Sequence, residues 1–279
     1  MKLIKQSFEF INQTDFSLVG IKKHIERCAR VSYKSEEKIT DTSYEKFVNM
    51  LESRGHDRPL EFGTVYLTLR GDDTNALRNI FTYTENPWTK IRKQVIKAEY
   101  DPNTHVVLNH VTTNYRVIVE NHLEEDLKYL CEPTEYHYKR YTVHMVLDRG
   151  VMDEFRTHVG LSHLAESTRY CNYSKDKFGN AITFIKPCWL DDEKLKLYGP
   201  YHTVIRDKSP ESIFIANLNN VERDYLDLIK LGWTPQQARS ILPLGIKSEL
   251  ISCGFKDAWE NFMRRRSPKY GDPGAHPMA

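Results

Sequence analysis

The sequence lacks three features that would each place it in a defined class of protein. Its five cysteines are scattered and form no CxxC pair, so neither a zinc site nor a disulfide framework is indicated. No apolar run is long enough to cross a bilayer. The formal net charge is only +2, which provides no strong field for nucleic acid or a membrane. We therefore expect neither a membrane nor a nucleic acid among its partners.

The N-terminal segment lacks the long apolar stretch of a secretory signal peptide. Scattered cysteines that do not suggest disulfides are typical of a reducing compartment. Together these two absences predict that the protein is cytoplasmic.

What is present is the composition of an ordinary globular protein, with 40% hydrophobic and 28% charged residues among 279. Helical and strand periods follow one another along the chain, and no repeat or low-complexity linker divides it. We predict an α+β fold with a largely antiparallel sheet flanked by helices, and a single domain over residues 1–279.

Local patterns predict the individual elements. Apolar spacing and caps indicate helices over residues 16–30, 41–54, 124–130, 211–231 and 256–265, with a helical turn at 235–239. Runs rich in β-branched and aromatic residues indicate strands over residues 64–69, 105–109, 117–119, 141–147 and 247–252.

The segment from Glu166 to Ser174 is the richest in chemistry and has no apolar period that would explain it. Arg169 offers a planar fork of donors that suits a phosphate. Ser167 and Thr168 add hydroxyls that can contact a phosphate or a base edge. This pattern favours a site for a phosphorylated small molecule. The alternative is a polar surface loop with an ion-paired arginine.

Other polar residues stand in unusual places. Arg239 precedes an apolar block, where an arginine is either ion-paired or holds an anion. Arg266 ends a helix, where a cation also suits the helix dipole. The histidines His158 and His163 fit no zinc signature, so we expect no metal. Either histidine is a candidate base for Cys171 if that thiol were a nucleophile.

Several of these motifs occur in an order that resembles a known family. They are Ala29-Arg30-Val31-Ser32-Tyr33, His56 with Glu61 five positions later, Ser167-Thr168-Arg169-Tyr170, Ala238-Arg239-Ser240-Ile241-Leu242-Pro243, and Asn261-Phe262 with Arg266. The order is similar to that of the flavin-dependent thymidylate synthases, the ThyX family. The matching pieces extend over most of the chain.

The resemblance implies a homotetramer whose active sites lie where subunits meet and bind dUMP against FAD. The implied reaction is reductive methylation of dUMP to dTMP, with methylenetetrahydrofolate as carbon donor and NADPH as hydride source. On this basis we expect dUMP, FAD, NADPH and the folate among the ligands.

The resemblance also implies roles for matching positions. The catalytic residues would be Arg266 and His56. Arg266 would favour ionisation at N3 of the pyrimidine, because a fixed cation lowers the pKa of a neighbouring acidic N–H. The implied substrate-binding set is Ser167, Thr168, Arg169, Arg239, Arg266 and Glu154. The implied cofactor-binding set is Ser32, His56, Arg58, Glu61, Thr157, His158 and Asn261.

The chain departs from the family pattern mainly at the flavin positions. Thr157-His158-Val159 stands where the family has Arg-His-Arg, and Arg156 is displaced from that motif by one residue. If this segment were a strand, the displacement would turn Arg156 to the opposite face. Arg58 replaces a threonine. The alternative hypothesis is therefore a relative that keeps the pyrimidine-nucleotide site and has lost or changed the flavin.

Overall fold

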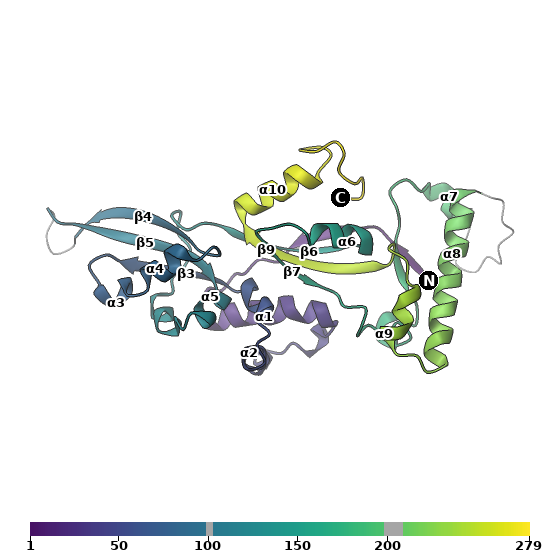
Figure 1. The fold of residues 1–279 in the computed structure, drawn as a ribbon, viewed down its shortest axis with the longest axis horizontal. Helices are drawn as coiled ribbons and strands as arrows, with labels where there is room; N and C mark the ends of the chain where they lie inside the picture. The colour runs from purple at the N-terminus through teal and green to yellow at the C-terminus, as the bar shows by residue number, and fades with distance from the viewer. Residues whose placement is uncertain (99–102, 198–208) are drawn as a thin grey trace.

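The structure is a computed structural model, and it describes residues 1–98, 103–197 and 209–279. The molecule is elongated (Figure 1). A β-hairpin arm forms one end, a sheet covered by helices forms the middle, and the long helix α8 forms the other end. The described strands make three sheets.

The central sheet has the order β2-β6-β9-β7 and is antiparallel throughout. Its strands are β2 (Ser7–Phe10), β6 (Arg140–Asp148), β9 (Lys247–Phe255) and β7 (Leu161–Ala165). Because successive residues of a strand point to opposite faces, β9 directs Leu250 and Ile251 into two different cores. The predicted antiparallel α+β architecture is confirmed.

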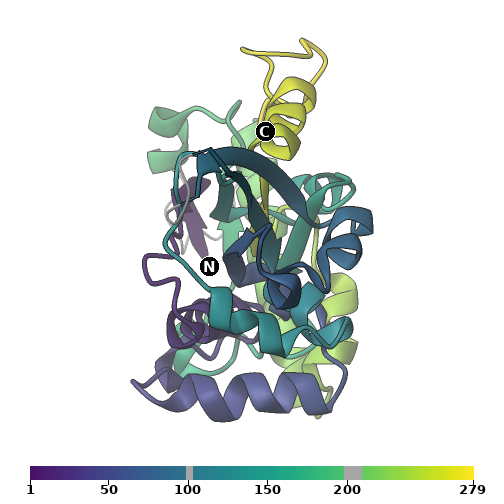
Figure 2. The ribbon, with the colours of Figure 1, turned by 90° about the vertical axis from the view of Figure 1, so that its left-hand side faces the viewer.

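Helices cover both faces of the central sheet. On one side lie α6 (Arg149–Phe155) and α10 (Lys256–Arg266), and on the other lie α1 (Leu18–Tyr33) and α2 (Ser43–Ser53). Figure 2 shows α2 and α10 at opposite edges of the molecule, with the sheets between them. The predicted helices at 16–30, 41–54 and 256–265 are thus confirmed to within three residues.

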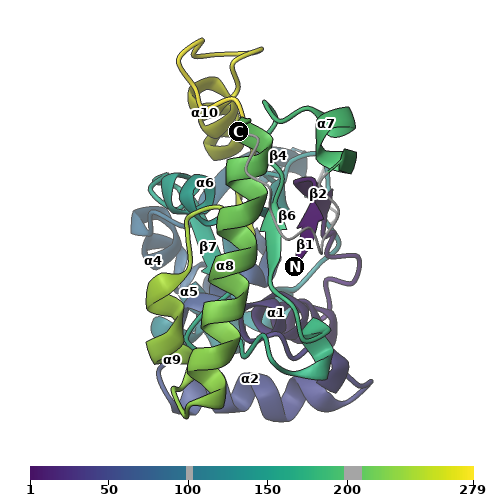
Figure 3. The same ribbon diagram turned by 90° about the vertical axis from the view of Figure 1, so that its right-hand side faces the viewer.

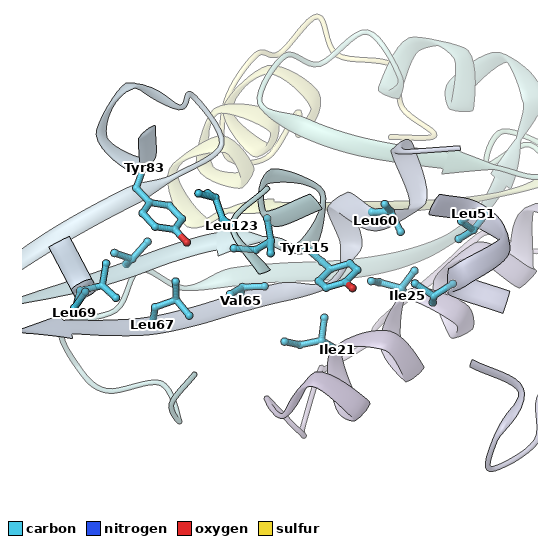
Figure 4. Close-up of a cluster of buried hydrophobic side chains, with 14 residues drawn as sticks. Ile21, Ile25, Leu51, Leu60, Val65, Leu67, Leu69, Tyr83, Tyr115 and Leu123 are labelled. Atoms are coloured by element: carbon cyan, nitrogen blue, oxygen red, sulfur yellow. The ribbon is translucent and has the colours of Figure 1, made fainter. Parts of the chain in front are cut away.

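The arm is a three-stranded antiparallel sheet with the order β3-β5-β4. It contains β3 (Thr64–Arg70), β4 (Lys90–Lys97) and β5 (His105–Asn114), with the short helices α3 (Thr74–Leu77), α4 (Ile80–Glu85) and α5 (Tyr115–Glu120). The 3-10 helices η2 (Arg58–Phe62) and η3 (Glu124–Tyr129) adjoin it. Figure 4 shows the core of this region, in which side chains from β3 meet Ile21 and Ile25 of α1.

The opposite end of the molecule is built around α8 (Pro210–Lys230). Beside it lie α9 (Pro235–Ala238) and η5 (Arg239–Ile241), as Figure 3 shows for α9. The strands β1 (Lys2–Ile4) and β8 (Thr183–Ile185) pair in parallel here. The remaining short elements are η1 (Glu36–Lys38), η4 (Asp176–Phe178) and α7 (Asp192–Leu197). Among the described residues no helix is long and apolar enough to span a membrane.

One predicted strand is wrong, and one conditional argument does not apply. Residues 117–119 belong to α5 and are not a strand, because the side chain of Asn114 accepts a hydrogen bond from the backbone N–H of Val117 (3.1 Å) and caps a helix there. The segment around Arg156 is not a strand either. Arg156 is the C-terminal cap of α6 and is followed by a turn, so the face-reversal argument does not apply to it.

Two buried histidines make the stability of the fold depend on pH. His24 of α1 faces Thr142 of β6. Nδ1 of His163 in β7 forms a hydrogen bond with the hydroxyl of Ser252 in β9 (2.8 Å). Burial lowers the pKa of each imidazole to about 4. The neutral form is therefore the one that the folded state favours.

We expect the free energy of unfolding to have its full value above pH ~6.5, where histidine in the unfolded chain is neutral. It should decrease as the pH drops toward 4. Each of the two histidines should contribute a loss on the order of 2 kcal/mol by pH 5. Urea unfolding at pH 7.5 and pH 5 measures this loss. His163→Gln should flatten the dependence, and an unchanged slope in that variant would contradict the assignment.

Candidate functional site

The predicted phosphate-binding segment is a tight turn that directly follows β7. Glu166 continues the pairing with β9, because its N–H donates to the carbonyl of Glu249 (2.8 Å). The N–H of Ser167 donates to the carbonyl of Ser32 in the last turn of α1 (3.2 Å), and the N–H of Tyr170 donates back to Ser167 (3.1 Å). The end of α1 therefore holds the turn, and this contact explains why the Ser32 motif and the Ser167 motif belong together.

Two exposed arginines lie against this turn. Arg239 of η5 donates from Nη1 to Oγ1 of Thr168 (3.4 Å), and Arg169 donates from Nε to Oε1 of Gln236 in α9 (3.2 Å). Within the ranges that the structure describes, neither guanidinium has a carboxylate within 4 Å. The alternative interpretation, a surface loop with an ion-paired arginine, therefore does not describe Arg169 or Arg239 within those ranges. Two such guanidinium groups beside hydroxyls suit a phosphate dianion.

Arg266 lies in a second cluster, at the end of α10. It donates from Nε to Nε2 of His158 (2.8 Å), from Nη1 to the carboxylate of Glu154 (2.7 Å) and from Nη2 to the Glu154 carbonyl (3.1 Å). These bonds use three of the five N–H donors of a guanidinium and fix its plane. Two donors are left for a ligand.

The contact with Arg266 defines the protonation state of His158. Its Nε2 can accept a hydrogen bond only when the ring is neutral with the proton on Nδ1. Burial and then the positive charge of Arg266 lower the pKa of His158, which agrees with a neutral ring. The ring packs on Phe262 of α10, with 4.8 Å between ring centroids.

Two other predicted cofactor residues are near this cluster. Thr157 donates from its hydroxyl to the carbonyl of Glu154 (2.7 Å). Asn261 accepts through Oδ1 from Arg264 (2.9 Å) and from Arg265 (3.4 Å). Val159 is 91% exposed and supplies no charge.

The predicted residues around η2 form a third group. Glu61 is buried, and its carboxylate accepts from Nη1 of Arg116 in α5 (2.5 Å). Its carbonyl accepts from Nη2 of Arg140 (2.9 Å). His56 and Arg58 are exposed at the start of this group. Glu61 therefore joins η2 to the arm and to the central sheet.

The structure brings the predicted substrate residues together only in part. Ser167, Thr168, Arg169 and Arg239 meet at the C-terminal end of β7, whereas the Arg266 cluster adjoins its N-terminal end. The strand has five residues and rises about 3.3 Å per residue, so β7 alone spans about 13 Å, and the two groups lie beyond its opposite ends.

Cys171 does not have the environment of a nucleophile. Its thiol donates to Oε1 of Glu166 (3.4 Å), and His163 is hydrogen-bonded to Ser252 instead. Burial and the neighbouring carboxylate raise the pKa of Cys171 to about 12, so the thiol stays protonated at neutral pH. The expectation that His158 or His163 could activate Cys171 is not met, because both imidazoles have other partners.

Sequence reasoning missed two residues of the Arg169 group. Gln236, which contacts Arg169, lay in a predicted helical turn without any role. Glu166 has no expected role beyond beginning the Glu166–Ser174 segment, although it is 2% exposed and its carboxylate binds Lys247 of β9 (3.0 Å). An acidic residue directly before a cationic, hydroxyl-rich turn was the one available signal.

The residues expected to hold a flavin do not fit FAD within one chain. The carboxylate of Glu61 is bound by Arg116, and His158 is bound by Arg266. At the position of the second family arginine, Val159 offers no donor for a pyrophosphate. The hydroxyl of Ser32 is buried and has no hydrogen-bond partner among the described residues.

The fold is that of an α+β protein in which two arginines adjoin a hydroxyl-bearing turn at one end of β7, an edge strand of the central sheet. A family model described as "Thymidylate synthase complementing protein" matches residues 131–277, which include β6, β7, β9 and both arginine groups. The chain belongs to this family, the ThyX family, as the motifs predicted.

Similar solved structures include a UMP/dUMP methylase, PolB from Streptomyces cacaoi, bound with 5-Br dUMP. It is 15% identical with a TM-score of 0.41, and the alignment covers 100% of this chain and 86% of that chain. Thymidylate synthase X from Helicobacter pylori, with FAD and dUMP, is 17% identical with a TM-score of 0.34 over 50% of this chain and 61% of that chain. A comparison with curated proteins found no match.

Proposed function

We propose that the protein binds a pyrimidine nucleoside monophosphate, such as dUMP, and methylates it at C5. The observation that carries this proposal is the pair Arg169 and Arg239, which flank the Ser167–Thr168 hydroxyls without a carboxylate partner among the described residues. Such a group matches the charge and the acceptor oxygens of a nucleotide phosphate. Membership of the ThyX family supports the pyrimidine and the reaction class.

In this proposal the phosphate lies between Arg169 and Arg239, and the pyrimidine lies at Arg266. The guanidinium of Arg266 stabilises the anion that forms when N3 loses its proton, because a fixed cation lowers the pKa of an adjacent acid. The ionised ring carries more electron density and is prepared for reaction at C5. Glu154 and His158 hold the guanidinium in position for this step.

The separation along β7 supports an assembly with shared sites. Arg169 and Arg266 of one chain lie beyond opposite ends of that strand. We infer that the Arg266 that completes a site belongs to a second copy, in a homotetramer with composite sites. Analytical ultracentrifugation measures the assembly directly.

The first candidate for the complete reaction is flavin-dependent synthesis of dTMP, with FAD, NADPH and methylenetetrahydrofolate. FAD would supply hydride transfer when bound. The second candidate is nucleotide binding with an altered or lost flavin site. The exposed, uncharged Val159 favours the second candidate, as does the engagement of Glu61 and His158 by arginines of the same chain.

The visible absorbance of the purified protein, titrated with FAD in the presence of dUMP, distinguishes these candidates. A bound-flavin spectrum at full occupancy supports dTMP synthesis, and formation of dTMP then tests it. A protein that binds dUMP but takes up no FAD supports the second candidate. Absence of dUMP binding under both conditions contradicts the proposed function.

We expect the double substitution Thr157→Arg and Val159→Arg to increase FAD affinity. The two new guanidinium groups restore the charge that a pyrophosphate needs, and both positions are exposed enough to accept a long side chain. A gain of about 10-fold corresponds to one additional charge-assisted hydrogen bond. The measurement is flavin fluorescence quenching, with Arg78→Ala in the arm as the control that should not change affinity. An unchanged affinity in the double variant contradicts the assignment of this turn to the flavin.

A further inference from the structure

The turn that carries Ser167, Thr168 and Arg169 begins and ends at residues whose side chains meet. Glu166 precedes the turn, and Cys171 follows it. The thiol of Cys171 donates to Oε1 of Glu166 (3.4 Å), so the carboxylate joins the two ends of the turn. Oε2 of the same carboxylate accepts from Nζ of Lys247 on β9 (3.0 Å). The turn is therefore fastened to the central sheet through one buried side chain.

We propose that Glu166 is a positioning residue, which holds the turn in the geometry that binds the nucleotide phosphate; this inference rests on the proposed function. Glu166 touches neither the expected phosphate nor the pyrimidine. It acts through the residues that it fastens. The same carboxylate binds the end of the turn and the sheet, so its loss releases both contacts at once.

The charge of Glu166 is balanced inside the protein. Lys247 also donates to Glu249, which in turn binds His144 of β6 (2.9 Å) and Lys34 at the end of α1. Burial opposes the charge of Lys247, but the two carboxylates outweigh it and raise the pKa of this lysine. Burial likewise opposes ionisation of Glu249, but His144 and the lysines lower its pKa. Lys247 and Glu249 are thus charged at neutral pH, and the network ties α1, β6 and β9 to the turn.

Cys171 is a donor in this arrangement and is itself held from a second side. Its thiol remains protonated because burial and Glu166 raise its pKa to about 12. The phenol of Tyr225 in α8 donates to the Cys171 carbonyl (3.3 Å), and Tyr225 is fully buried. The C-terminal end of the turn is therefore fixed both to Glu166 and to α8.

Burying a carboxylate costs stability compared with a well-packed apolar side chain. A leucine at position 166 could fill similar space without the need for Lys247. The charged arrangement gives instead a directional connection between the turn and the sheet. A turn that is ordered before the nucleotide arrives loses less conformational entropy on binding, which strengthens binding.

The test compares Glu166→Leu, Glu166→Gln and wild type in the full-length protein. Titration calorimetry with dUMP gives the affinity, and amide hydrogen exchange without ligand gives the order of residues 167–171. We expect Glu166→Leu to weaken dUMP binding at least 10-fold and to accelerate exchange in the turn. Glu166→Gln keeps an acceptor for Cys171 and should restore the affinity to within about threefold of wild type.

Asp126→Leu is the matched control, because Asp126 is also a buried carboxylate with two hydrogen-bond donors, Tyr83 and Asn79. It lies beside the arm, away from the turn. This variant should lower the melting temperature but leave dUMP affinity and the exchange of the turn unchanged. If Glu166→Leu fails to fold, Cys171→Ala removes the contact at the other end of the turn and leaves Lys247 on Glu166. It should weaken dUMP binding and accelerate exchange in the turn, whereas Cys171→Ser keeps a donor and should behave as wild type.

Folded Glu166→Leu with wild-type dUMP affinity and wild-type exchange overturns the inference while leaving the proposed function intact. In the fallback variants, wild-type affinity of Cys171→Ala overturns it equally. Equal losses in Glu166→Leu and Asp126→Leu also overturn it, because they indicate a general loss of stability. A wild-type protein that binds no dUMP contradicts the proposed function itself, and the inference falls with it.

Discussion

Replacement of Arg266 by alanine is expected to lower kcat about 100- to 1,000-fold, the range seen when one group that stabilises a developing anion is removed. The guanidinium is held by Glu154 and His158, so its charge is fixed before the nucleotide binds. Dissociation constants for dUMP should rise much less, because the phosphate contacts remain. Product formation from dUMP with methylenetetrahydrofolate, NADPH and FAD measures kcat, and calorimetry measures affinity.

A second measurement tests the role of Arg266 in ionisation without requiring the complete reaction. The ultraviolet spectrum of bound dUMP changes when N3 ionises, and Arg266 should shift that change to lower pH by stabilising the anion. In Arg266→Ala the transition should move back toward that of free dUMP. Arg223→Ala is the control, because Arg223 also pairs with an acidic residue on an exposed helix face. An identical spectrum of bound dUMP in Arg266→Ala and wild type would exclude the role in ionisation.

Arg169→Ala is expected to weaken dUMP binding about 10- to 150-fold and to leave the fold intact. A hydrogen bond to a charged group contributes about 1.5–3 kcal/mol, which corresponds to this range. The side chain is exposed and its described hydrogen bond is to Gln236, so its removal leaves no buried group without a partner. Calorimetry gives the affinity, and circular dichroism the melting temperature.

The nature of the ligand can be tested with the same variant. Deoxyuridine lacks the phosphate, so its weaker binding should be almost the same in Arg169→Ala and wild type. Arg78→Ala removes an exposed arginine from the arm and should affect neither ligand. The phosphate assignment fails if Arg169→Ala binds dUMP with wild-type affinity, or if it loses dUMP and deoxyuridine equally.

The sequence predicted elements well where local physics determines them. The helix at residues 41–54 was indicated by a capping cluster and a terminal glycine, and α2 is found at Ser43–Ser53 with Gly55 at a φ of 63°. Where two local signals competed, the prediction failed. Residues 117–119 are all β-branched, yet the cap that Asn114 provides three residues before Val117 starts a helix.

The site shows the same division between local and long-range information. The types of residue in the Ser167–Arg169 turn indicated a phosphate, and the order of motifs indicated the family. No local pattern could place Arg239 on Thr168, 71 residues away, or Gln236 on Arg169, 67 residues away. Those contacts depend on how α8, α9 and η5 pack beside the central sheet.

By itself, the sequence determined the α+β class, most helices, the family and the residues with phosphate-binding chemistry, because periodicity, caps and short motifs are local properties. Only the tertiary structure decided that Arg169 and Arg266 lie beyond opposite ends of β7, and that Glu166 fastens the turn that carries Arg169 to β9. The register of β7 on β9 sets where these residues lie along the sheet. That register is determined by the burial of both sheet faces along whole strands.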